Sequence, residues 1–133
     1  MPVSEKMSVN WEKMIAKAGN YPEQAFQFVR DGLSYTTDLL SRDDDSLTEE
    51  DRHVSGQELC LGMRDLAIKR YGALAGLVLS HWHIHRTEDF GRIVFAMVDE
   101  GLMRATAQDS IEDFRDVFDF AEAFNPAELA ARI

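Results

Sequence analysis

Three of the four histidines lie close together near the middle of the chain, at His81, His83 and His85. Zinc and nickel bind imidazole nitrogens, so with His53 or a nearby carboxylate this segment could supply a four-ligand site. On a helix, however, only side chains three or four residues apart share a face, so only His81 and His85 would meet. We therefore predict polar surface here and no metal site. A metal-binding protein using the HWHIH segment is a second alternative.

Residues that could act as a nucleophile or as a general acid or base lack the partners that such chemistry needs. Cys60, the single cysteine, lies in a segment with an apolar helical pattern, so a buried thiol is expected. Asp99 with Glu100 and Asp113 with Asp116 are acidic pairs near helix ends and turns, where carboxylates are usually solvated. The sequence contains no GxSxG, HExxH or GxGxxG motif. We expect a protein without enzymatic activity and without a cofactor.

The elements that carry these residues are expected to be mainly helical. Residues 9–18 and 22–40 have apolar residues at helical spacing, and Pro22 suits the first position of the second helix. Together these two helices would form an N-terminal helical arm in residues 1–41. Residues 42–52 are an acidic run with one apolar residue, which predicts a solvated loop.

Three successive helix patterns follow the acidic run. Ser55 and Glu58 fit a capping box at the start of the first, and Gly72 is placed to end it. Thr87 is expected to cap the third helix, which Gly101 ends. The short second helix between them carries four apolar residues at core spacing, Leu74, Leu77, Val78 and Trp82.

The segment after the third helix has the pattern of a β-hairpin. Leu102–Thr106 and Val117–Phe120 are each apolar enough for a strand, and turn residues separate them. A helical turn beginning at Ser110 is the alternative, because the apolar residues after it also lie at helical spacing. We predict the hairpin.

The predicted fold is therefore mainly α with a minor β part. A helix-turn-helix unit with a small β-hairpin forms a winged-helix-like core over residues 53–120, and the N-terminal helical arm precedes it. Asn125 and Pro126 predict a C-terminal helix within residues 121–133. A chain of 133 residues with 45% hydrophobic residues can bury a core as a single domain, 1–133, without a disulfide or a metal.

The formal charge of −10 disfavours nucleic acid and anionic membranes as partners. None of the four segments, 1–41, 42–52, 53–120 and 121–133, carries net positive charge, and phosphate binding depends on Lys and Arg. The third helix, which would enter a DNA groove, offers one base, Arg92, against four acids on its solvent face. We predict a protein partner. A DNA-binding transcriptional regulator acting as a homodimer is the alternative.

The chain ends and the apolar segments predict a cytoplasmic protein. The N-terminus has no apolar run of signal-peptide length, and the longest apolar stretch, residues 73–79, is too short to span a bilayer. A single cysteine is compatible with a reducing compartment.

Several segments resemble a family of small uncharacterised bacterial proteins found chiefly in the planctomycete and verrucomicrobial branch. The similarity runs from about Tyr21 to Phe124 and rests on YPEQAFQFVRDGL, RHVSGQELCLGMRDLA, YGALA, TEDFGRIVFAMVDEGL and DFRDVFDFAEAF. It implies no activity, cofactor or site residue. The family typically has Trp, Gly, Ile where this chain has Trp82, His83 and Ile84. The resemblance thus implies that His83 replaces a glycine that ends a helix, which weakens the metal hypothesis.

These observations favour a protein-interaction module, either an adaptor or a small regulator. Its partner-binding residues are expected on a rim beside the acidic loop 43–51, and a homo-oligomer is compatible with the sequence. The rim residues are His53, Gln57, Trp82, His85 and Arg92.

Overall fold

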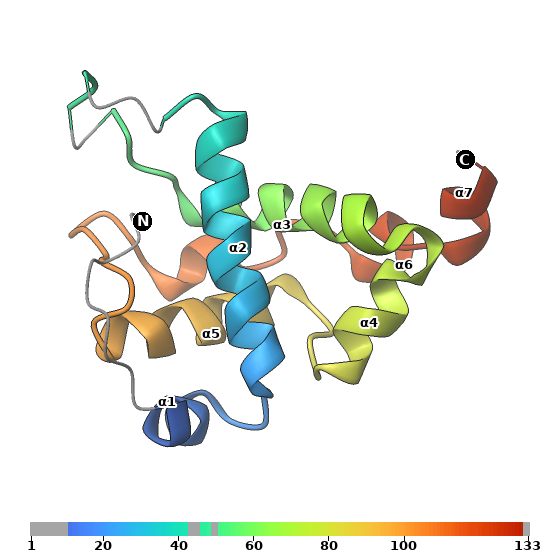
Figure 1. Ribbon diagram of the computed structural model, residues 1–133, viewed down its shortest axis with the longest axis horizontal. Helices are drawn as coiled ribbons and strands as arrows, with labels where there is room; N and C mark the ends of the chain where they lie inside the picture. Colours follow the sequence, from blue (N-terminus) through green and yellow to red (C-terminus); the bar gives the residue numbers. More distant parts are fainter. Residues whose placement is uncertain (1–10, 43–45, 49–50, 132–133) are drawn as a thin grey trace.

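The computed structural model describes residues 11–42, 46–48 and 51–131, and this part of the chain is mainly helical (Figure 1). Residues 9 and 10 of the first expected helix, and residues 43–45 and 49–50 of the expected acidic loop, lie outside the described residues. The elements are α1 (Trp11–Ala18), α2 (Glu23–Leu39), α3 (Gly56–Tyr71), the 3-10 turn η1 (Gly72–Leu74), α4 (Ala75–His81), α5 (Thr87–Asp99), the 3-10 turn η2 (Ile111–Phe114), α6 (Phe120–Ala123) and α7 (Pro126–Ala131).

The second helix, α2, lies at the centre of the fold and not in a peripheral arm. It packs most extensively on α3 and also contacts α5, and Figure 1 shows it crossing both. Phe26, Phe28, Val29 and Leu33 of α2 are buried, so this helix supplies a large share of the apolar core. α1 packs on α5 through the buried Met14. The predicted N-terminal arm is therefore part of the core of its own chain.

Short-range caps fix two of the predicted helix starts. The Ser55 hydroxyl accepts from the Glu58 amide and the Glu58 carboxylate accepts from the Ser55 amide, both at 3.1 Å, which confirms the capping box. Asn125 caps α7 by accepting from the Glu128 amide at 3.1 Å. These contacts lie within three residues, so they form wherever the helix forms.

Thr87 was the expected cap of α5, and that prediction is wrong. Arg86 is the N-cap residue, and Asp89 in the first turn reaches back to it, because its Oδ2 accepts from the amides of His85 at 2.8 Å and Arg86 at 3.2 Å. The buried Thr87 hydroxyl instead donates to the Phe114 carbonyl at 2.6 Å and accepts from the Val117 amide at 3.2 Å. It ties the start of α5 to a segment nearly thirty residues further along the chain.

The predicted β-hairpin is also wrong. Residues 102–120, all of which the structure describes, contain no strand. The alternative is what forms: Ser110 caps η2 by accepting from the Glu112 amide at 3.2 Å. The physical reason is Phe114, which is buried between α3 and α5 and cannot point away from them as a wing residue would. The three predicted helices of residues 53–101 are confirmed, but the winged-helix-like core is not.

His83 adopts a left-handed backbone conformation at the end of α4, with φ +63°. Its amide donates to the Ser80 carbonyl and the Ile84 amide to the Leu79 carbonyl, both at 2.9 Å, which is the Schellman pattern. Ile84 is fully buried and so holds the turn in place. Glycine is the residue that adopts this conformation without strain.

We therefore expect His83→Gly to raise the free energy of unfolding by about 0.5–1 kcal/mol, since relief of left-handed strain exceeds the entropy that glycine adds to the unfolded chain. The His83 side chain is exposed, so its loss removes little packing. Urea unfolding followed by circular dichroism measures the change. His83→Ala, which keeps the strain, should show no gain, and equal stability of the two variants would contradict the explanation.

Candidate functional site

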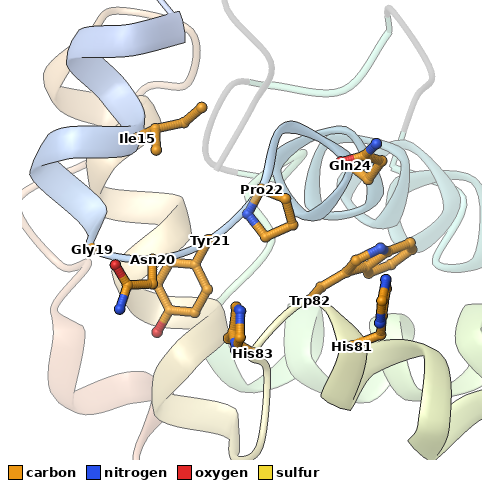
Figure 2. Close-up of a pocket in the computed structure, with 9 residues that line it drawn as sticks. All are labelled: Ile15, Gly19, Asn20, Tyr21, Pro22, Gln24, His81, Trp82 and His83. Carbon is orange, nitrogen blue, oxygen red and sulfur yellow. The ribbon is translucent and has the colours of Figure 1, made fainter.

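A groove of about 700 Å³ lies between the α1–α2 connection and the end of α4 (Figure 2). Figure 2 shows Pro22 and Gln24 facing His81 and Trp82 across the groove, with His83 beside the Tyr21 ring. The groove is open to solvent and is lined by both aromatic and polar side chains, which makes it a candidate site for contact with a partner. Its lining residues are Ile15, Gly19, Asn20, Tyr21, Pro22, Gln24, His81, Trp82 and His83.

A buried polar network holds one wall of the groove. The Tyr21 hydroxyl donates to Asp89 Oδ1, and both residues are at most 5% exposed. Arg92 Nη1 lies 3.5 Å from the same carboxylate, whose second oxygen accepts the two backbone amides that precede α5. Hydrogen bonds to a buried carboxylate are strong and directional. They fix the α1–α2 connection against the start of α5, so this wall of the groove is positioned in advance of binding.

Burial raises the pKa of Tyr21 to about 12, and the hydrogen bond from its hydroxyl to Asp89 and the negative charge of that carboxylate add to the effect. Folding therefore favours the protonated phenol. The resulting stability is fully present below pH 10 and is lost as the pH rises toward 12, because the unfolded chain releases this proton first.

The expected result is a free energy of unfolding that falls between pH 10 and pH 12 with a slope approaching about 1.4 kcal/mol per pH unit for one proton. Tyr21→Phe removes the titrating group, so its profile over the same window should be flatter than that of the wild type. Urea unfolding at several pH values measures both. Parallel profiles for the two proteins would contradict the assignment to Tyr21.

The opposite wall of the groove is anchored in the aromatic core. The half-buried Trp82 ring lies 5.7 Å from Phe28 and 6.1 Å from Tyr71, centroid to centroid, and meets Tyr71 edge to face. Phe28 in turn contacts Phe90 of α5 at 6.5 Å. Trp82 thus presents one side to the groove while the other side is held by the core.

Two leucines in and directly before α4 are exposed, although they were predicted to be core residues. Leu74 and Leu77 are 60% and 69% exposed, whereas Ala75 and Leu79 on the other side of the helix are fully buried. The spacing of these apolar residues is that of a buried helix face. Only one side of that face is buried, because the elements packed on α4 cover that side and leave the other in solvent. Leu77 and His81 are four residues apart and therefore share a helix face. Because His81 lines the groove, the exposed leucines lie on the face that continues into it. We call Leu74, Leu77, His81 and the groove the α4 surface.

The charge around the α4 surface differs from that of the whole chain. No acidic residue falls between Asp65 and Glu88, a run of 22 residues that holds Lys69, Arg70 and Arg86. This run carries +3, so the remainder of the −10 chain carries −13. The net charge of residues 53–120 as a whole is negative, so the sum over that segment does not reveal the positive charge of this run.

The five residues predicted to form one partner-binding rim lie in two places. Trp82 lines the groove, and the His85 amide and the Arg92 guanidinium contact Asp89, the partner of Tyr21. His53 and Gln57 lie instead at the start of α3. Trp82 packs on Tyr71, which follows Gln57 by 14 residues, or about 21 Å of helix.

His53 takes part in contacts that hold the chain in place before α3. Its Nε2 lies 2.8 Å from Asp109 Oδ1, and its carbonyl accepts from Arg42 Nη1 at 2.9 Å. Arg42 also bonds Glu58 at 2.7 Å, so the chain before α3 is tied to both the helix and the 104–110 loop. Burial raises the pKa of Glu58, but the Arg42 hydrogen bond and the Ser55 amide outweigh it and bring that pKa below its usual value.

The other chemical candidates are separated or buried in the described residues. No three His, Cys, Asp or Glu side chains of that part of the chain gather in a group that could hold a metal ion. Cys60 is fully buried, and burial raises the pKa of its thiol, as expected for a core residue. No helix among the described residues is both long and apolar enough to cross a bilayer.

No family model, curated protein or solved structure matches this chain. The resemblance to the bacterial family therefore stays a prediction. The function has to be inferred from the residues and surfaces of the chain itself.

Proposed function

We propose that the protein is a non-enzymatic protein-interaction module of the cytoplasm, an adaptor or a small regulator, whose partner binds along the α4 surface. The exposure of Leu74 and Leu77, three residues apart beside a groove, carries this proposal. Neighbouring large apolar side chains rimmed by polar residues are typical of interaction sites. Removing each leucine from water would contribute about 1.5–3 kcal/mol if its side chain became fully buried.

The groove supports the proposal because its walls are already ordered. Tyr21 is held by Asp89, and Trp82 is held by Phe28 and Tyr71. A partner that contacts the half-buried Trp82 ring need not immobilise it, so less of the binding energy is lost to ordering. Trp side chains in such positions are frequent anchors of protein interfaces.

Leu77→Asp tests the proposal, with Leu39→Asp as the matched control. Leu39 is 54% exposed at the last residue of α2, the opposite end of that helix from the groove. We expect wild type and Leu39→Asp to retain a stoichiometric partner from native lysate, and Leu77→Asp to retain at least about tenfold less. Circular dichroism checks that both variants fold.

Two results would count against the proposal. One is repeated failure of the wild-type protein to retain any stoichiometric partner. The other is equal recovery of the partner by Leu77→Asp and Leu39→Asp, because the interaction would then use another surface.

A further inference from the structure

We infer that the partner docks on the α4 surface through an acidic amphipathic helix; this inference rests on the proposed function and specifies the chemistry of the partner. Three features of the surface carry it. The α4 surface is apolar along Leu74 and Leu77, it continues into an aromatic groove, and it belongs to a part of the chain from which acids are missing.

The absence of acids is a property of the assembled groove and not of one segment. The longest acid-free run in the sequence is 66–87, and the next longest, of ten residues, is 13–22 between Glu12 and Glu23. The fold brings these two runs together: residues 81–83 of the first, and Ile15 with residues 19–22 of the second, line opposite sides of the groove (Figure 2). The chain has 24 acidic residues, and none of them is among the lining residues of this groove, which favours the approach of an acidic ligand.

Three basic side chains belong to the same acid-free run as the apolar strip. Lys69 and Arg70 occupy the last turn of α3, directly before η1, and Arg86 follows the α4 turn; all three are exposed. Arg70 Nη1 also lies 3.1 Å from Asp31, but this pair is half-exposed, and a guanidinium has five N–H donors to share. Carboxylates on the edges of a partner helix would meet these cations.

The apolar strip specifies the apolar residues that the partner helix needs. Leu74 and Leu77 lie one helical turn apart, and the Trp82 ring lies beyond them at the groove. A helix with apolar residues at positions i, i+3 or i+4, and i+7 presents a stripe that covers such a row. The partner therefore combines a leucine-type stripe with flanking Asp and Glu.

A second copy of this chain fits the surface less well. A two-fold dimer through the α4 surface would place like surfaces against each other, with Lys69 and Arg86 of one protomer near the same residues of the next. Facing like charges disfavour such pairing. A dimer detected by sedimentation and abolished in Leu77→Asp would overturn the inference.

The experiment uses the full chain and two synthetic amphipathic peptides with identical leucine positions, one with Glu and one with Lys at every polar position. We expect the Glu peptide to bind at least about tenfold more tightly than the Lys peptide, with an affinity that falls as salt is added. Fluorescence anisotropy gives the affinities, and amide shifts in NMR spectra should concentrate in residues 13–22 and 66–87. Equal or tighter binding of the Lys peptide would overturn the inference.

Variants separate this inference from the proposal beneath it. Lys69→Glu with Arg86→Glu should weaken the Glu peptide at least about tenfold, whereas Arg115→Glu, an exposed reversal after η2, should leave it unchanged. Leu77→Asp should weaken both peptides. If a lysate partner depends on Leu77 but not on the Lys69 and Arg86 charges, the proposed function stands and the acidic partner is excluded.

Discussion

Replacing Phe114 by alanine is expected to lower the free energy of unfolding by about 3–5 kcal/mol, the usual cost of removing a buried aromatic ring. Phe114 is fully buried and lies edge to face with Phe95 at 6.2 Å. A Cβ on Gly56 or on Gly91 would lie 2.9 Å from its atoms, so the ring packs directly on two helices at positions without side chains. The backbone of α3 and α5 cannot collapse to fill the cavity.

Urea unfolding followed by circular dichroism measures this loss, and an unchanged dependence on denaturant would show that the fold is kept. Phe114→Leu retains most of the apolar volume and should cost roughly 1–2 kcal/mol, which gives a milder variant of the same site. A loss below about 1 kcal/mol for Phe114→Ala would contradict the position of η2 between α3 and α5.

Gly62→Ala is expected to lower the free energy of unfolding by about 2 kcal/mol, although alanine favours a helix over glycine by about 1 kcal/mol. A Cβ at Gly62 would lie 1.8 Å from the Thr36 Oγ1 atom of α2. Thr36 is buried and its hydroxyl donates to the Gly32 carbonyl at 2.6 Å, so it has no open space to move into. The two helices must separate to accept the methyl group.

A double-mutant cycle tests the origin of this effect. Thr36→Ala removes the hydroxyl that the new methyl group would strike, so Gly62→Ala should cost less in the Thr36→Ala background than in the wild type. The difference is the coupling free energy between the two positions, expected to be at least about 1 kcal/mol. Additive losses would mean that Gly62 matters through helix propensity or another neighbour.

Predictions from the sequence succeeded where a side chain acts on nearby backbone. Ser55 with Glu58 and Asn125 with Glu128 make their hydrogen bonds within three residues, so residue type and spacing were sufficient evidence. They failed where two local structures compete. The hairpin and the turn at Ser110 use the same apolar residues, and contacts of Phe114 with α3 and α5, far away in the sequence, select the turn.

The candidate site shows the same division. Trp82, His85 and Arg92, which the sequence predicts as partner-binding residues, lie at or behind the groove, whereas Tyr21 was not predicted, because its hydrogen-bond partner Asp89 is 68 residues away. Leu74 and Leu77 were assigned to the core, since the period of an apolar stripe is the same whether the chain or a partner covers it.

The sequence by itself determined α1 to α5 and α7, the caps at Ser55 and Asn125 and the two acid-free runs, because these depend on residue order and on interactions within a few residues. Only the tertiary structure decided that α2 is the central helix, that Leu74 and Leu77 face water, and that the runs 13–22 and 66–87 meet at one groove. Burial and the meeting of distant segments depend on which helix faces pack together, and the energies that select this packing arise from many side chains far apart in the sequence.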